Sequence, residues 1–453
     1  PAEPATAPLR VVARGERRVE AGPAAVAVPP LRERINPAAA RHEIPVLRDR
    51  QVLLYALTAA LAGLLFGFDV AVISGAEQAI QREWSLSPAV HGLVLSAALW
   101  GTVAGALGGS WPTDRLGRKP TLIGIAAAYV IASLGSALAP DPWSFTAFRA
   151  LGGLAIGVSS ITAPAYITEI APPHKRGRLV ALYQFNIVAG ILVAYFSNWA
   201  ITALAHPHGW RLMLGIQTLP SVGLLFATLL IPESPVWARG SRGPTALGND
   251  WAAFLKPPLR RPAGLALTIA LFNQLSGINA VIYFAPRIFA EAGLSENAAL
   301  FASVGIGVVN LVATGIAVLL IDRAGRRPLM LIGSTGYCLS LGALALAFAA
   351  GRGALVAPAV FCFIAAHAIG QGAVIWVFIA EIFPTRARAR GQTLGCGMHW
   401  IMAALVTAVL PPALAAFPPA AIFGFFATMM LAQLAWVLAI MPETRGAQAT
   451  GAD

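Results

Sequence analysis

The sequence predicts an all-α membrane protein with twelve transmembrane helices in two six-helix repeats. Three observations carry this prediction. Of the 453 residues, 57% are hydrophobic and only 11% are charged, whereas a soluble domain carries about 25% charged residues. The apolar residues gather into twelve runs, each long enough to cross a bilayer as a helix, which takes roughly 20 residues. Three short motifs recur in the same order in both halves of the chain.

The twelve apolar runs give the expected spans in chain order. Charged or turn-forming residues separate them, and the limits are good to a few residues. The expected spans are 52–75, 89–111, 119–139, 144–170, 179–204, 211–231, 263–288, 298–321, 328–350, 355–382, 391–415 and 419–441.

The basic residues of the chain are distributed unevenly among the loops. The net charge of +12 is compatible with nucleic-acid binding as well as with a membrane role. Of the 32 Lys and Arg residues, 27 lie in the loops after even-numbered spans or in the two tails, and four lie on the other side. Cytoplasmic loops carry such an excess. We therefore expect both termini in the cytoplasm and no nucleic-acid partner.

The first 50 residues differ in composition from the rest. They hold nine arginines and six acidic residues and lack Phe, Trp and Tyr. We expect a disordered basic cytoplasmic tail that lies on anionic lipid headgroups, with no secretory signal peptide. The expected organisation is a tail at 1–50, six-helix bundles at 51–235 and 263–442, a short cytoplasmic linker at 236–262 and a cytoplasmic tail at 443–453.

The recurring motifs indicate a duplicated six-helix unit. Each motif returns about 210 residues later, and the three keep their order. Parallel repeats of this kind are typical of secondary transporters, which bind their substrate at the repeat interface near the bilayer midplane. The matched segments are 114–120 with 322–328, 169–172 with 381–384, and 232–234 with 442–444.

One acid and one base lie inside the expected spans. Asp69 is about seven residues from the end of the first span, and Arg149 is about six residues into the fourth. Both are therefore roughly 10 Å from the same membrane face, where a charge costs about 2.5–3.5 kcal/mol and usually has a partner. The hypothesis is that Asp69 is the proton-coupling site and that Arg149 controls its protonation. The alternative is a purely structural ion pair.

Nothing in the sequence indicates an enzyme or a metal protein. The three cysteines, Cys338, Cys362 and Cys396, fall inside apolar spans and are interpreted as small core residues. His206 and His208 have no Cys or carboxylate nearby and are interpreted as a polar loop. The glycine-rich run 152–157 lies within a span, where it suits close helix packing and not phosphate binding.

A set of motifs in a fixed order resembles the sugar porters of the major facilitator superfamily over residues 52–446. The likeness is greatest to bacterial proton-coupled sugar symporters. The resemblance implies the major facilitator fold and proton:sugar symport by alternating access. It also implies a bacterial inner membrane location, a monomer in the bilayer, and no cofactor besides the coupling proton. The motifs are 67–69, the Asp-Arg-x-Gly-Arg loops, 148–149, 164–172, 274–279, Trp376 before 381–384, and 442–446.

The seventh span carries residues suited to a sugar. Side-chain amides both donate and accept hydrogen bonds, and aromatic rings stack on C–H faces. Gln274 and Asn279 would lie roughly 140° apart on a straight helix, but Ser276-Gly277 between them allows a break that brings both to one cavity. Amide bonding between helices is the alternative. The resemblance implies as cavity residues Phe66, Gln184, Gln274, Asn279, Tyr283 and Trp376, the last as stacking platform, with Asn310, His399 and Trp400 as weaker candidates.

The loops at the arginine-rich side predict a network of ion pairs. An acid lies beside several bases in each Asp-Arg-x-Gly-Arg loop, and Glu169 and Glu381 end inward-running spans at similar depth. We expect these groups to latch the cytoplasmic side when the substrate site faces out. The alternative is positive-inside charge with no latch role. The predicted latch comprises Asp114, Arg115, Arg118, Glu169, Arg176, Glu233, Asp322, Arg323, Arg326, Glu381, Arg390 and Glu443.

The sequence departs from the family pattern at several points. Ile191 stands where xylose symporters carry a glutamine, and the linker 236–262 is short, with one amphipathic turn expected at 251–255. The sugar is therefore left open. A facilitative uniporter, a proton-coupled polyol (inositol) transporter and a sugar sensor that signals through the tail are the alternatives to a proton:sugar symporter.

Overall fold

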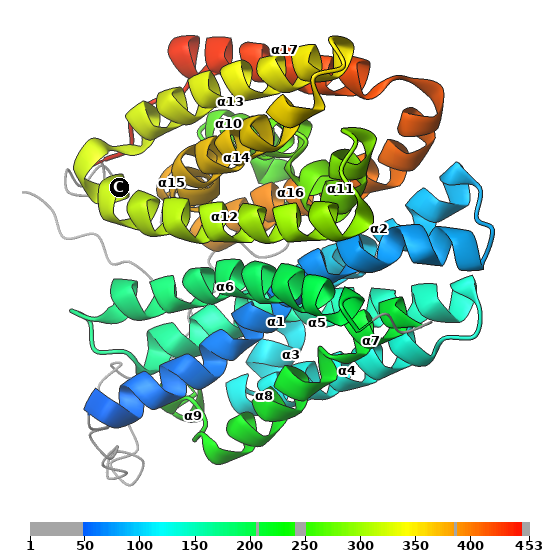
Figure 1. Cartoon of the computed structure of the whole chain (residues 1–453). Helices are drawn as coiled ribbons and strands as arrows, with labels where there is room; N and C mark the ends of the chain where they lie inside the picture. Colours follow the sequence, from blue (N-terminus) through cyan, green and yellow to red (C-terminus); the bar gives the residue numbers. More distant parts are fainter. Residues whose placement is uncertain (1–48, 205–207, 241–250, 385–386, 446–453) are drawn as a thin grey trace, which may run out of the picture. The chain divides into compact units, whose positions relative to one another are not determined.

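The computed structural model of the chain describes residues 49–204, 208–240, 251–384 and 387–445, except for the side chain of Asp322. Most of the expected N-terminal tail, part of the linker, His206 and the end of the C-terminal tail lie outside the described residues. Within the described residues the chain is helical and contains no strand (Figure 1). Twelve helical segments in the described part of the chain are long and apolar enough to cross a membrane, which confirms the predicted all-α, twelve-span architecture.

The first six spans form the N-terminal bundle. Within it, α1 packs on α6, α2 on α5, and α4 on both α5 and α8. The sixth span consists of α7 and α8, and the very short α3 and α9 lie in loops. The helices are α1 (Asp49–Glu83), α2 (Pro88–Gly108), α3 (Ser110–Arg115), α4 (Arg118–Leu138), α5 (Pro142–Ile170), α6 (Arg176–Thr202), α7 (Gly209–Gly215), α8 (Thr218–Leu230) and α9 (Pro235–Ala238).

The last six spans form the C-terminal bundle, in which α13 packs on α17 and α10 on α16. A 3-10 turn, η3, precedes them at the position where the sequence predicts one amphipathic turn. The elements are η3 (Trp251–Leu255), α10 (Arg260–Leu275), α11 (Ile278–Glu291), α12 (Glu296–Ala324), α13 (Arg326–Ala349), η4 (Gly353–Leu355), α14 (Val356–His367), η5 (Ala368–Gly372), α15 (Ala373–Glu381), α16 (Arg388–Ala416) and α17 (Pro419–Ala439).

Two spans of the C-terminal bundle are interrupted in mid-course. The seventh breaks between α10 and α11, where Gly277 has φ +82°, as the Ser276-Gly277 pair predicts. The tenth contains one turn of π-helix, η5, between α14 and α15, which the sequence analysis did not predict. π-helical turns are rare and frequent at functional sites. The first span is also longer than expected, because α1 continues past residue 75 to Glu83.

The two bundles contact each other differently at the two ends of the helices. We call the end with the loops 109–118, 171–176, 324–326 and 382–388 the arginine-rich end, and the opposite end the arginine-poor end. Towards the arginine-poor end one apolar cluster contains residues of both bundles, such as Ile73 of α1 and Ile282 of α11. Towards the arginine-rich end each bundle has an apolar cluster of its own. Across the interface α2 packs on α16 and α6 on α12 (Figure 1).

Candidate functional site

A buried ion pair joins α1 and α5 inside the N-terminal bundle. Arg149 donates from Nη1 to Asp69 Oδ1 at 2.6 Å and from Nη2 to Oδ2 at 2.9 Å. Nη2 also donates to the main-chain oxygen of Asp69 at 3.2 Å. The two residues are 2% and 3% exposed, so the pair is shielded from water. The structure therefore brings together the acid and base that the sequence predicts to meet.

The start of α5 and a glycine on its inner face fix the position of Arg149. Asp141 caps α5, accepting from the N–H groups of Trp143 at 2.9 Å and Ser144 at 3.0 Å. These bonds hold the pKa of the Asp141 carboxyl below its usual value. One turn beyond Arg149, a Cβ at Gly152 would lie 3.3 Å from Ala132 Cβ of α4, tighter than ordinary contact. The glycine thus allows α5 to pack closely on α4, a role that the sequence analysis missed.

The break in the seventh span brings its amides together. Asn279, on the first turn of α11, donates from Nδ2 to Gln274 Oε1 at 2.6 Å. Gln274 Nε2 in turn lies 2.9 Å from Asn273 Oδ1 and 3.2 Å from His399 Nε2. All four side chains are buried. The predicted convergence of Gln274 and Asn279 is therefore present. The amides bond to one another within this span and contact another span through His399, so the sugar site and the alternative of amide bonding between helices both stay predictions.

A row of aromatic rings runs beside these amides and links the two bundles. Phe66 of α1 lies 5.5 Å from Trp400 of α16, between ring centroids. His399 is 4.9 Å from Trp400 and 4.9 Å from Trp376 of α15. The row thus begins in the N-terminal bundle and ends at Trp376, and its His399 contacts Gln274. Six of the predicted sugar-site residues therefore lie in one contiguous cluster: Phe66, Gln274, Asn279, Trp376, His399 and Trp400.

The remaining predicted sugar-site residues are not joined to this cluster by hydrogen bonds between described residues. Tyr283 lies one turn beyond Asn279 on α11; it is 1% exposed, and its hydroxyl has no partner among the described residues. Asn310, on α12, accepts from Thr314 one turn along its own helix at 3.4 Å. Gln184 is half-buried on α6. The structure therefore leaves their predicted roles untested.

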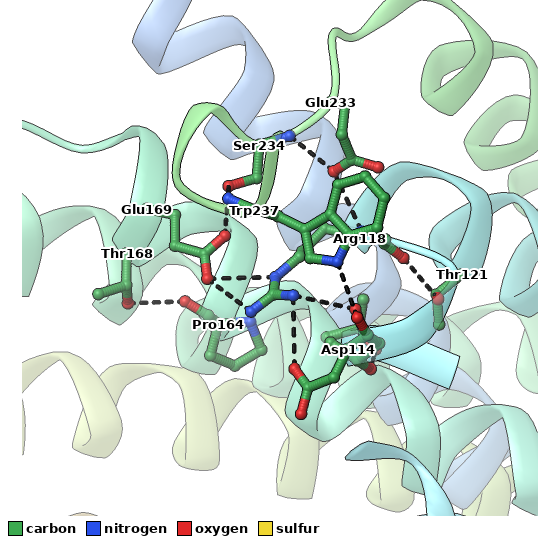
Figure 2. Close-up of polar contacts among 12 residues, drawn as sticks. Asp114, Arg118, Thr121, Pro164, Thr168, Glu169, Glu233, Ser234 and Trp237 are labelled. Carbon is green, nitrogen blue, oxygen red and sulfur yellow. Dashed lines mark hydrogen bonds and ion pairs between the residues drawn. The ribbon is translucent and has the colours of Figure 1, made fainter. Parts of the chain in front are cut away.

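At the arginine-rich end of the N-terminal bundle a compact polar cluster surrounds Arg118 (Figure 2). Arg118 pairs with Glu169 at 2.8 Å and more weakly with Asp114 at 3.4 Å. The hydroxyl of Ser234 donates to Glu169. Glu233 accepts the N–H groups of Arg118 at 3.0 Å and Lys119 at 3.2 Å. The predicted Arg118–Glu169 pair is thus one part of a cap on α4.

The C-terminal bundle repeats the main contacts of this cluster. Arg326 pairs with Glu381 at 2.8 Å, and the Thr444 hydroxyl donates to Glu381 at 2.6 Å. Glu443 accepts the N–H groups of Arg326 and Arg327, both at 3.0 Å. Partial burial opposes ionisation of Glu443, but the main-chain donors prevail and lower its pKa. The three matched motifs therefore fold into one structural unit in each half.

The predicted latch partners are only partly as expected. Glu169 pairs with Arg118 and Glu381 with Arg326, so each pair lies within one bundle. Arg115 lies 5.8 Å from the ring of Trp111, Arg390 lies 5.8 Å from that of Trp251, and Arg176 and Arg323 are exposed. Ion pairing across the bundles at this end is not seen among the described residues. A latch between bundles stays a prediction.

A duplicated twelve-span fold, with an intramembrane ion pair in one half and an amide and aromatic cluster in the other, defines the class of secondary transporters. The family model described as "Sugar (and other) transporter" matches residues 55–243 and 239–452. Together these matches span nearly the whole described chain. The chain belongs to the sugar porter family of the major facilitator superfamily.

Individual relatives agree with this assignment. The chain is 33% identical over 448 residues to an arabinose-proton symporter of Bacillus subtilis (strain 168), covering 90% of this chain and 97% of the relative. It is 32% identical to a galactose-proton symporter of Escherichia coli (strain K12), covering 85% and 90%. Among solved structures, a partially occluded inward-open form of the xylose transporter XylE from E. coli matches with TM-score 0.76 and 28% identity, covering 88% and 99%.

Proposed function

We propose that the protein is a proton:sugar symporter of the bacterial inner membrane, working by alternating access as a monomer with both termini in the cytoplasm. The relatives named as proton symporters for arabinose and galactose support the coupling ion and the substrate class. The excess of Lys and Arg at the arginine-rich end supports its cytoplasmic placement. The observation that carries the proposal is the bidentate pair of Asp69 and Arg149, buried in the N-terminal bundle.

The coupling step follows from the electrostatics of this pair. A buried carboxylate and guanidinium stabilise each other only while both are charged, and losing one partner leaves the other uncompensated. Protonation of Asp69 would turn its carboxylate into a neutral acid, weaken both Arg149 bonds and free α1 to move relative to α5. In the proposed cycle the proton enters with the sugar and leaves from Asp69 at the cytoplasmic side.

The sugar site of the proposal is the cluster around Gln274. Its amides offer both donors and acceptors, which sugar hydroxyls require, and Trp376 offers a ring face for C–H groups. A bound sugar would replace part of the bonding that Gln274, Asn279 and His399 now make to one another. Phe66 belongs to the other bundle, so side chains of both bundles would contact a sugar bound along the aromatic row.

Substitution of Asp69 by Asn in proteoliposomes tests the coupling. We expect uphill uptake driven by a pH gradient to be lost while sugar counterflow, which needs no proton, continues. Asp141→Asn is the matched control, because Asn also caps helices well and Asp141 lies outside the ion pair; it should retain uphill uptake. Unchanged pH-driven accumulation by Asp69→Asn would rule out Asp69 as the coupling site.

Two alternatives share the fold and differ in coupling or substrate. A facilitative uniporter would show counterflow but no uphill uptake even in the wild type. A polyol transporter would take inositol in preference to sugars. Counterflow with labelled pentoses, hexoses and inositol, with and without a pH gradient, separates the three. Binding without any transport would instead indicate a sugar sensor.

A further inference from the structure

The arginine-poor end contains a second ion pair, formed by a fully buried acid and a partly buried arginine, and this one joins the two bundles. Glu77 of α1 is 0% exposed. Arg287 of α11 donates from Nε to Glu77 Oε1 at 2.9 Å and from Nη2 to Oε2 at 2.7 Å. Nη2 also donates to Oε1 of Gln81, one turn further along α1, at 2.6 Å. Three hydrogen bonds therefore tie one arginine of the C-terminal bundle to one helix of the N-terminal bundle.

A buried histidine completes this group of side chains. His91 of α2 is 0% exposed, and its Nε2 lies 3.5 Å from Glu77 Oε2. Neither ring nitrogen has a hydrogen-bond partner among the described residues. Glu77 is thus enclosed between α1, α2 and α11. We name Glu77, Gln81, His91 and Arg287 together the outer clamp.

The Glu77 carboxylate keeps its hydrogen bonds to Arg287 only while the two bundles are in contact at this end. A fully buried carboxylate is costly unless it is paired and hydrogen-bonded, and its bidentate partner belongs to the other bundle. A movement that carried α11 away from α1 would break the pair and admit water to the buried Glu77 carboxylate. The contacts around the clamp also join the two bundles. The apolar cluster at this end contains residues of both, and the Tyr195 hydroxyl of α6 donates to the main-chain oxygen of Ile282 of α11 at 2.8 Å.

We propose that the outer clamp is the gate that holds the arginine-poor end shut, and that it must open before sugar can enter from that side. Glu77 lies eight residues beyond Asp69 on α1, about 12 Å along the helix. One rigid helix therefore carries both the coupling acid and the gate acid. A tilt of α1 that follows protonation of Asp69 would act directly on the gate. This last link rests on the proposed function, whereas the gate itself does not require proton coupling.

The experiment measures the width of the arginine-poor end directly. Spin labels are placed at Ala89 and Asn297, which are exposed on α2 and α12, in a full-length chain whose three native cysteines are replaced by Ser. Electron–electron double resonance in nanodiscs, without sugar, then gives the distribution of distances between the bundles. The variants compared are Glu77→Gln, Arg287→Gln and the charge exchange of Glu77→Arg with Arg287→Glu.

Glu83→Gln is the matched control. Glu83 lies on the same helix and at the same end, but its partner Arg211, at 2.9 Å, belongs to the same bundle. We expect each single substitution of the clamp to raise the ratio of the long-distance to the short-distance population at least tenfold. The control should leave it within twofold of the wild type, and the charge exchange should return it towards the wild-type value.

Two outcomes would overturn the gate. The first is a wild-type distribution in both Glu77→Gln and Arg287→Gln. The second is an equal change in Glu83→Gln, which would indicate general loosening of that end. Because the labels report opening without transport, failure of the gate differs from failure of symport, which wild-type uptake with and without a pH gradient reads separately.

Discussion

Asp69 and Glu77 lie on the same helix, and each binds an arginine through two hydrogen bonds. The partner of Asp69 comes from the same bundle, whereas the partner of Glu77 comes from the other. The first pair can therefore respond to a proton without any movement of the bundles, and the second can respond to movement without a proton. In the two proposals made above, this difference in partner gives the two carboxylate–arginine pairs separate tasks, coupling and gating.

At the residue scale, Gln274 is the sharpest test of the sugar site. Gln274→Ala removes the acceptor of Asn279 and the donor to Asn273 and His399. Losing a buried hydrogen-bonding group costs about 1–3 kcal/mol, so the apparent sugar affinity should fall roughly 5- to 150-fold. Counterflow at increasing sugar concentration measures this affinity.

Gln371→Ala is the matched control for Gln274→Ala. Gln371 is also 0% exposed and lies in the same bundle, but it bonds to Gln433 of α17, which in turn donates to Ser334. Gln371→Ala should change the free energy of unfolding but leave the apparent sugar affinity close to that of the wild type. An equal loss of affinity in both variants would mean that Gln274 acts through packing, and the sugar site would have to be sought elsewhere.

At the element scale, the starts of α4 and α13 depend on one glycine each. Gly117 has φ +107° and Gly325 has φ +94°, conformations that residues with a Cβ rarely adopt. A Cβ at Gly117 would also lie 2.3 Å from Glu233 Oε2, the carboxylate that caps α4. We expect Gly117→Ala to lower the free energy of unfolding by about 1–3 kcal/mol, measured as a lower melting temperature in detergent.

Gly124, two turns further along α4, provides the comparison. A Cβ there meets nothing within 4 Å, and Ala is favoured over Gly inside a helix by about 0.5–1 kcal/mol. Gly124→Ala should therefore keep or raise the melting temperature. A fall of similar size in both variants would contradict the capping argument.

Several elements were predictable from sequence because the signal for each is local. Long apolar runs fix the spans, and Ser276-Gly277 marks the break because glycine alone adopts φ +82° at little cost. The π-turn η5 carries no such mark, since Ala368–Gly372 would also suit an α-helix. The extension of α1 was missed because the charged and polar residues from Glu77 onwards resemble a loop. That error hid Glu77, although its pairing with Arg287 follows the logic applied to Asp69.

At the scale of the whole molecule, the duplication explains what the sequence could not assign. Motif order places Arg118 and Glu169 at the same membrane depth as Arg326 and Glu381, but depth alone does not say whether an arginine pairs within its bundle or across the interface. Packing decides, and in each half the arginine reaches the glutamate of its own bundle. Ser234 and Thr444, which complete the clusters, gave no signal beyond their place in the repeat.

The final prediction follows from this separation of the two clusters. Glu169→Gln and Glu381→Gln each remove one partly buried ion-pair partner, and each should lower the melting temperature by roughly 2–6 °C. Because the clusters share no partner among the described residues, the shift in the double variant should equal the sum of the single shifts. Arg118→Gln with Glu169→Gln is the contrasting pair; its shift should fall short of the sum, since both changes break the same bond. If the Glu169 and Glu381 substitutions were coupled as strongly as this pair, the glutamates would meet across the bundles in a populated state, and the arginine-rich end would be latched between bundles after all.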